Sequence, residues 1–115
     1  MTARPKFRYI RSNRLLHACR MLPCQLCGAI DGTVVAAHSN QGIHGKGKSI
    51  KASDVFIAAL CNLCHMQIDQ GRNLSEDQRV ERWNKAHAKT FRELLSLGLW
   101  PVDVPFPDSG MEVAE

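Results

Sequence analysis

The sequence predicts a small α+β domain that a four-cysteine zinc site holds together and that a long helix flanks on its C-terminal side. Two Cys-x-x-Cys pairs, Cys24 with Cys27 and Cys61 with Cys64, have the double spacing of a closed tetrahedral zinc site. Two short apolar runs lie between the pairs, and a long amphipathic pattern follows the second pair. A chain of 115 residues makes one domain with a small core, which a structural Zn²⁺ would stabilise.

We expect three regions along the chain: a basic segment over 1–22, the zinc-stapled domain over 23–98, and an extended, partly disordered acidic tail over 99–115. The first twenty residues carry six Arg or Lys and lack the apolar core of a signal peptide. No apolar run reaches the roughly 18 residues that a membrane span needs. These features predict a protein of a reducing cytoplasm, and they predict that Cys19, the fifth cysteine, is a small buried hydrophobe.

The elements up to the first strand follow from local patterns. Residues 7–22 mix Arg with apolar positions and predict a short, uncapped amphipathic helix that Pro23 ends. The first cysteine pair is followed by Gly28, which can adopt the backbone angles of a zinc knuckle. Asp31-Gly32 is a hairpin-type turn signal, and the β-branched, apolar residues 33–38 predict a strand with His38 at its end.

Between the strands and the second cysteine pair the pattern changes twice. Residues 39–51 are rich in Gly and polar side chains and predict a loop. Residues 54–60 are a short apolar run, which predicts a second strand, although the alanines also allow a helix. Residues 64–70 predict a helix, with Gly71 in the left-handed conformation that often ends one.

The clearest helix is predicted over 76–97, with Ser75 and Gln78 as a capping box and Gly98 as its end. We expect His87, in its middle, to be a surface or packing residue. One stripe should pack on the zinc-bound core: Val80, Trp83, Phe91, Leu94 and Leu95. The basic positions should lie mostly outside: Arg79, Arg82, Lys85, Lys89 and Arg92.

Two further patterns indicate chemistry. His65 and Asp69 are four residues apart on the predicted helix, so their side chains share one face and could hold a divalent cation. His65 could equally cap the zinc site, and Asp69 could be a solvated surface residue. The net charge of +4 suits a polyanion partner. The basic residues that we expect to meet nucleic acid are Arg8, Arg11, Lys46, Lys48 and Lys51.

The motifs together resemble the HNH endonucleases, the ββα-metal class of His-Me finger nucleases. The resemblance covers about residues 24–71 and rests on Cys24-x-x-Cys27, on Ala36-Ala37-His38 and on Leu60-Cys61-x-x-Cys64-His65. The stretch Gly45 to Asp54 looks like small phage-encoded HNH proteins and the phage recombination enhancement function nuclease.

The resemblance implies a catalytic His38 that acts as general base on water. It also implies one Mg²⁺ or Mn²⁺ at the scissile phosphate, which the side chains of His65 and Asp69 would hold. His65 counts as catalytic through this cation, and Asp54 is the third catalytic candidate, because it either orients the base or supplies a ligand to the cation. A second assignment stays open, in which His38 binds the cation and His44 is the base.

The implied function is cleavage of DNA in phage recombination or processing, in the cytoplasm of a bacterial host cell. Two other functions fit the same residues. The first is a non-catalytic zinc module that binds DNA or a protein, because Ala37 stands where many HNH enzymes have a metal ligand. The second is an adaptor that acts only beside a phage or host recombination protein or a terminase.

Overall fold

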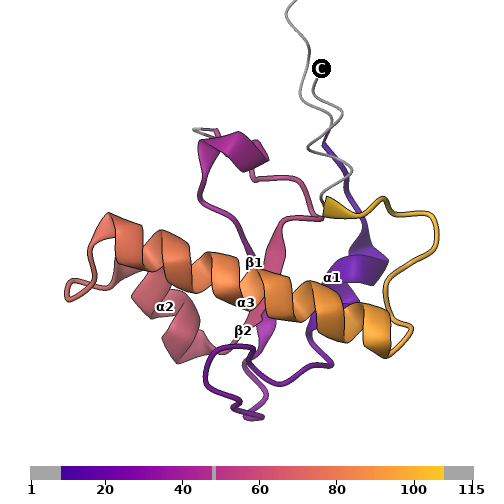
Figure 1. Ribbon diagram of the computed structural model, residues 1–115, viewed down its shortest axis with the longest axis horizontal. Helices are drawn as coiled ribbons and strands as arrows, with labels where there is room; N and C mark the ends of the chain where they lie inside the picture. Colours follow the sequence, from indigo (N-terminus) through magenta and orange to yellow (C-terminus); the bar gives the residue numbers. More distant parts are fainter. Residues whose placement is uncertain (1–8, 48, 108–115) are drawn as a thin grey trace, which may run out of the picture.

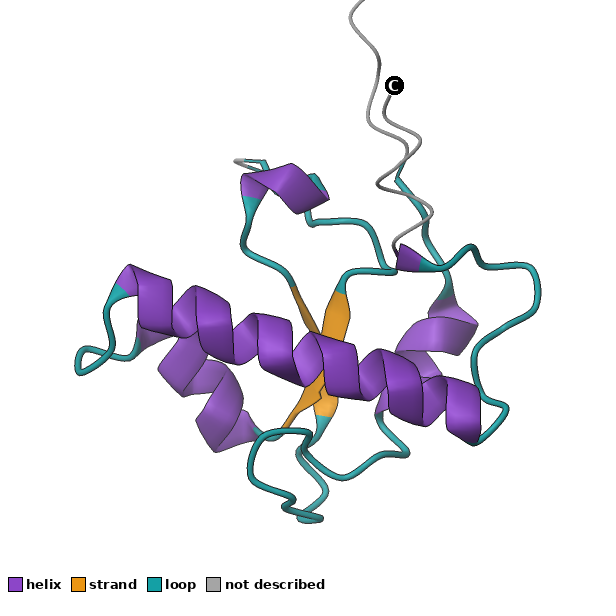
Figure 2. Ribbon diagram, viewed as in Figure 1, coloured by secondary structure: helices purple, strands orange, loops and turns teal. Residues whose placement is uncertain are grey.

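The fold is built on a two-stranded antiparallel sheet of β1 (Val35–His38) and β2 (Ile57–Leu60), with His38 opposite Ile57. The structure is a computed structural model, and it describes residues 9–47 and 49–107. Three helices surround the sheet: α1 (Asn13–Cys19), α2 (Asn62–Gln70) and α3 (Glu76–Ser96). Figure 1 shows α3 lying across the sheet, with α1 and α2 at its two sides, and Figure 2 shows that long loops join these elements. This is a small mixed α/β domain, as predicted.

Both strands form, but each begins later than predicted. Thr33 donates its backbone N–H and its hydroxyl to the Asp31 carboxylate, at 3.0 and 2.7 Å, and this local turn takes it out of the sheet. Before β2, the Phe56 N–H bonds to the Ser53 carbonyl at 3.0 Å, so 53–56 is a turn and the strand starts only at Ile57. His38 is the last residue of β1, as predicted.

Helix α1 is shorter than the predicted helix over 7–22, part of which lies outside the described residues. It begins after Ser12, whose side-chain oxygen accepts the Leu15 N–H at 3.2 Å, so the helix has the N-cap that the sequence prediction missed. Leu15 and Cys19 are fully buried in the core. Burial also raises the pKa of the Cys19 thiol to about 12, which confirms its expected role as a buried apolar residue.

Helix α2 starts at Asn62, two residues before the predicted Cys64, and ends before Gly71. The prediction that Gly71 is left-handed is wrong, because its φ is −67°. A side chain at this position would collide with the backbone carbonyl oxygen of Gln67. Glycine is therefore required here for close approach of the backbone and not for a positive φ.

Helix α3 confirms most of the prediction for residues 76–97. Both bonds of the Ser75 and Gln78 capping box are present, and Gly98 follows the helix with φ +71°. Trp83 and Leu94 are buried against the sheet. Leu95 is 41% exposed, so its inclusion in the packing stripe is wrong. It lies about 100° around the helix from Leu94, beyond the narrow strip that a two-stranded sheet can cover.

The outer edge of β2 is closed by hydrogen bonds from other elements. Ala59 donates its N–H to the Thr90 hydroxyl at 3.0 Å and accepts the Gln25 N–H at 2.9 Å. The Ile57 carbonyl bonds to Nδ1 of His87 at 2.8 Å. These bonds pair backbone groups that an open edge strand would leave exposed, and they make His87 a packing residue.

The C-terminal segment differs from the predicted extended tail over 99–115. Within its described part, Trp100 and Val104 are buried, and the Trp100 indole donates to the Val104 carbonyl at 2.9 Å. Phe91 of α3 packs edge-on against both Trp100 and Phe106. Residues 99–107 therefore fold back on α3, because their aromatic side chains find apolar partners there. Residues 108–115 lie outside the described part.

None of the helices that the structure describes is long and apolar enough to cross a membrane.

Candidate functional site

The four paired cysteines meet at one point, between the loop that follows α1 and the first turn of α2. Their sulfur atoms all lie within 4.8 Å of one another, and Cys27 and Cys61 are 3.7 Å apart. A tetrahedral zinc ion with Zn–S bonds of about 2.3 Å places its ligands about 3.8 Å apart, so the separation fits. Over residues 9–47 and 49–107, this is the one group of three or more potential ligands that could hold a metal ion such as zinc.

The electrostatics of this cluster also favour a cation. Burial on its own raises the pKa of the Cys24 thiol. The backbone N–H groups of Cys27, Cys61 and Leu26 point at its sulfur, however, and their hydrogen bonds lower that pKa to about 6. For Cys64, burial and the three neighbouring thiols raise the pKa. A bound cation would remove the repulsion between these sulfurs and stabilise all four thiolates.

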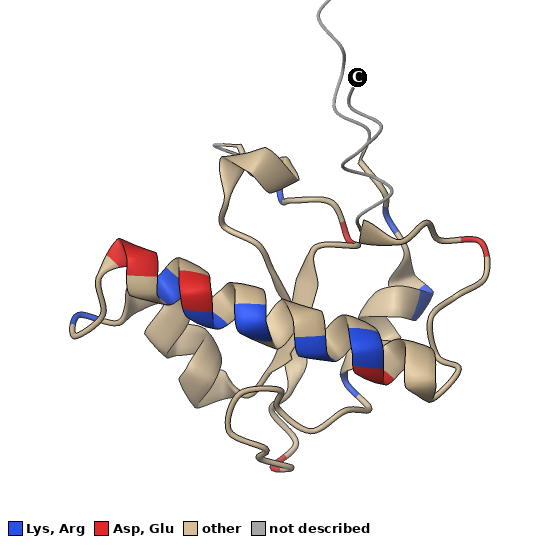
Figure 3. Ribbon diagram, viewed as in Figure 1, with Lys and Arg blue, Asp and Glu red and all other residues tan. Residues whose placement is uncertain are grey.

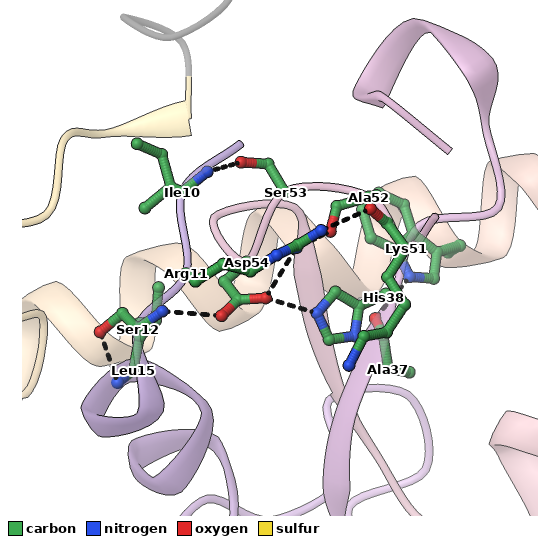
Figure 4. Close-up of polar contacts among 11 residues, drawn as sticks. Ile10, Arg11, Ser12, Leu15, Ala37, His38, Lys51, Ala52, Ser53 and Asp54 are labelled. Carbon is green, nitrogen blue, oxygen red and sulfur yellow. Dashed lines mark hydrogen bonds and ion pairs between the residues drawn. The ribbon is translucent and has the colours of Figure 1, made fainter. Parts of the chain in front are cut away.

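A second polar cluster joins His38, at the end of β1, to Asp54 in the segment before β2. The imidazole Nε2 and the carboxylate Oδ1 are 2.8 Å apart, and Figure 4 shows the two side chains pointing toward one another. Asp54 is 2% exposed, whereas His38 is half-buried and reaches solvent. A buried carboxylate that bonds a half-buried imidazole is an arrangement that orients a general base.

The N-terminal segment supplies the other partners of Asp54. The Ser12 N–H donates to Oδ2 at 2.7 Å, and Nη1 of Arg11 donates to Oδ1 at 3.2 Å (Figure 4). The Arg11 guanidinium is itself held by the Ala52 carbonyl at 2.6 Å and the Lys51 carbonyl at 2.9 Å. We expected Arg11 to meet nucleic acid; its guanidinium makes three hydrogen bonds within the protein, one of them to Asp54, and the side chain is 43% exposed.

The contacts of Asp54 indicate which nitrogen of His38 serves which role. Both carboxylate oxygens of Asp54 accept hydrogen bonds, so Nε2 of His38 is the nitrogen that donates to Oδ1, and Nδ1 is the nitrogen that can act as an acceptor. Because three donors already occupy the carboxylate, Asp54 is suited to orient His38 and not to bind a cation. Nδ1 of His38 is therefore the atom that can take a proton from water.

His65 and Asp69 lie on one face of α2, as their spacing predicted. Nε2 of His65 is 3.2 Å from Oδ2 of Asp69, and Asn40 donates to Oδ1 of Asp69 at 2.8 Å. Both side chains of the pair are about one third exposed. The bond from Asn40 ties the chain just after β1 to the C-terminal half of α2. The pair lies beside an open cleft of about 580 Å³ that Asn40, Asp69 and Arg79 help to line.

His44, the other candidate base, lies in the core. It stacks on Phe56 with ring centroids 4.2 Å apart, and Nδ1 bonds to the Ser39 hydroxyl at 2.7 Å. Burial, and then repulsion from His87, lowers the pKa of His44 to about 4. His44 is thus a neutral packing residue at pH 7, which leaves His38 as the candidate base.

The remaining basic candidates are less well placed or lie outside the described residues. Lys46 is half-buried and bonds the Gly47 carbonyl at 3.0 Å, and Lys51 is exposed. Arg8 and Lys48 lie outside the described residues. The Arg11 and Ser12 contacts with Asp54 had no sequence signal, because more than 40 residues separate the partners.

The chain was also compared with known proteins. No protein-family model matches the chain, and neither the curated proteins nor the solved structures yield a match.

Proposed function

We propose that this protein is a metal-dependent DNA endonuclease of the HNH type, in which His38 is the general base. The observation that carries the proposal is the 2.8 Å contact between His38 and the buried carboxylate of Asp54. The chain order β1, β2, α2 and the cysteine cluster beside it support a ββα-metal core with a structural zinc ion. Phage DNA recombination or processing is the setting that the sequence resemblance favours.

The reaction begins with a water molecule beside His38. Nδ1 takes a proton from this water while the water oxygen forms a bond to phosphorus. The bond between phosphorus and the departing 3′ oxygen breaks, and a solvent water protonates that oxygen, which leaves a 5′ phosphate and a 3′ hydroxyl. His38 is then an imidazolium, and the negative charge of Asp54 at Nε2 stabilises it.

His65 and Asp69 are the side chains that would hold the divalent cation. Mg²⁺ or Mn²⁺ bound there would stabilise the negative charge on the scissile phosphate and on the leaving oxygen. One imidazole nitrogen and one carboxylate, both partly exposed, suit a cation that keeps several water ligands. Binding requires that Asp69 exchange its bond with His65 for a bond to the cation.

Plasmid cleavage by full-length, zinc-loaded protein tests the proposal. We expect nicking with Mg²⁺ or Mn²⁺, and a loss of about 100-fold or more in His38→Ala, the usual range for a missing general base. His17→Ala is the matched control, because His17 is an exposed histidine on α1, and it should cut like the wild type. Cleavage by His38→Ala at the wild-type rate would exclude His38 as the base.

A non-catalytic zinc module that binds DNA or a protein is the second candidate. One observation favours it: both Asp69 oxygens already have partners in His65 and Asn40, and Ala37 offers no further ligand. Zinc-loaded wild type that binds DNA but cuts none with either cation would establish this alternative. His65→Ala combined with Asp69→Ala should abolish cleavage without loss of zinc if the endonuclease proposal is correct.

A further inference from the structure

Helix α3 presents a row of cations on the side that faces away from the sheet. Arg82, Lys85, Lys89 and Arg92 are all exposed. With 100° per residue, their spacings of three, four and three place them within a sector of about 80°. Figure 3 shows a series of blue segments along α3, with red segments beside them. We call these four residues the α3 basic row.

The α3 basic row has acidic neighbours but makes no ion pair with them. None of its four side chains forms an ion pair with a carboxylate among the residues that the structure describes. Two acidic residues of the same stretch, Glu81 and Glu93, lie at the two borders of the sector. The four cations are thus left to face solvent, which is where a polyanion could meet them.

The row is long enough to reach several phosphates of a nucleic-acid strand. From Arg82 to Arg92 the helix rises about 15 Å at 1.5 Å per residue. One strand of duplex DNA carries a phosphate about every 3.4 Å along the axis, so this length spans about four phosphates. The helix is also rigid, because the capping box fixes its start and Trp83 and Leu94 are buried against the core.

A groove lies at the C-terminal end of the row. It has a volume of about 510 Å³ and is formed by residues 24–28 of the first cysteine pair together with Lys89, Arg92 and the acidic Glu93. A DNA strand that follows the row would therefore reach a concave, mainly polar site at the end of the helix. The cysteine cluster holds one wall of this groove in place.

We infer that the α3 basic row and the adjoining groove form a surface that binds the phosphate backbone of duplex DNA. The inference takes its partner class from the proposed function but does not depend on catalysis. Of the N-terminal and loop cations first expected to bind nucleic acid, Arg11 is engaged with Asp54, and Lys46 with a backbone carbonyl. The α3 basic row therefore supplies the largest set of exposed, unpaired cations on one described element.

Fluorescence anisotropy with a labelled 20-base-pair duplex tests this surface. Full-length protein carrying His38→Ala keeps the probe intact, and Lys85→Gln, Lys89→Gln and Arg92→Gln are added to it together. We expect at least a 10-fold loss of affinity at 0.1 M salt, with the salt slope reduced by about 2 to 3, since each phosphate contact contributes about 0.9. The loss should be equal for unrelated duplex sequences, because phosphate contacts carry no sequence information.

The matched control removes three exposed cations elsewhere, with Arg14→Gln, Arg20→Gln and Arg72→Gln in the same background. Both triple variants lower the net charge by the same three units at different positions, and the control also loses the exposed 3.8 Å ion pair of Arg14 with Asp103. Equal losses in the two variants, or no binding of the duplex by the parent protein, would overturn the inference. Zinc content and circular dichroism show whether each variant is folded. Should the triple variant not fold, Arg92→Gln alone must lower the salt slope by about 1.

The outcome is separable from that of the endonuclease proposal. Binding that depends on the α3 basic row, in a wild type that never cuts, leaves this surface standing and rejects the endonuclease. Cutting by the wild type, combined with unchanged binding in the Lys85, Lys89 and Arg92 variant, rejects this surface and leaves the endonuclease standing.

Discussion

Asp54→Asn is the substitution that most directly tests the polar cluster, because it keeps the size of the side chain and removes its charge. An asparagine can offer one oxygen to His38 and Arg11, but its NH₂ group then faces the Ser12 N–H. Two donors would oppose each other where Ser12 now donates at 2.7 Å to a carboxylate that is 2% exposed. The reversed amide loses the bonds to His38 and Arg11 instead.

The expected cost follows from these contacts. A hydrogen bond to a charged group contributes about 1.5–3 kcal/mol, and an unpaired buried donor costs about 1–3 kcal/mol. We expect the free energy of unfolding to fall by about 3 kcal/mol. With a urea slope of about 1.5 kcal/mol per M, the unfolding midpoint falls by about 2 M. The measurement is urea unfolding by circular dichroism at a fixed free zinc concentration, because bound metal shifts the midpoint.

Asp103→Asn is the matched control for this measurement. Asp103 is 68% exposed and lies 3.8 Å from Arg14, also exposed, so its loss should change stability by less than about 0.5 kcal/mol. An Asp54→Asn protein with the midpoint of the control would refute the claim that Asp54 is held by three strong bonds.

Three other perturbations have expected outcomes. Mass spectrometry under native conditions should find one zinc ion per chain. We expect Cys19→Ala to retain the zinc ion and Cys61→Ala to lose both the zinc ion and the fold. Zinc retained in both variants would contradict the four-cysteine site. Burial lowers the pKa of His44 to about 4 in the folded protein, so between about pH 6.5 and 4 the unfolded chain binds a proton that the folded protein does not bind. The free energy of unfolding is therefore highest above about pH 6.5, and it falls by up to about 3 kcal/mol as the pH drops to 4. His44→Gln should lack that part of the pH dependence, and an unchanged difference between the two proteins across this range would reject the assignment. Thr90→Val removes the hydroxyl that accepts the buried Ala59 N–H and should cost about 1–3 kcal/mol in thermal or urea unfolding, whereas Thr90→Ser should stay near the wild type.

Local patterns in the sequence predicted the elements whose cause is itself local. The capping box at Ser75 needs only residues within one turn, and Gly98 ends α3 through its own backbone angle. The cysteine spacing predicted the cluster because each Cys-x-x-Cys pair brings two sulfurs together within four residues of chain. The pairing of His65 with Asp69 followed from the geometry of one helix.

Non-local contacts explain what the sequence could not predict. The support of Asp54 comes from Arg11 and Ser12, which are more than 40 residues away and carry no motif. The contact between Gly71 and Gln67 is local, but it depends on the extended backbone angles of Gly71, and the presence of a glycine after a helix does not reveal which angles it adopts. The C-terminal segment folds back because Phe91 offers it an aromatic partner, and composition alone did not reveal that contact.

The aromatic packing described above gives the protein two natural fluorescent reporters. The chain has two tryptophans, and each is buried with its indole N–H bonded to a backbone carbonyl, Trp83 to Ala37 and Trp100 to Val104. Trp83 thus reports on the docking of α3 against the sheet, and Trp100 on the closure of the C-terminal segment. Because Phe91 of α3 contacts Trp100, both reporters depend on the same helix. The sheet and the C-terminal segment therefore belong to one cooperative folding unit, in which single-tryptophan proteins would unfold with coincident transitions.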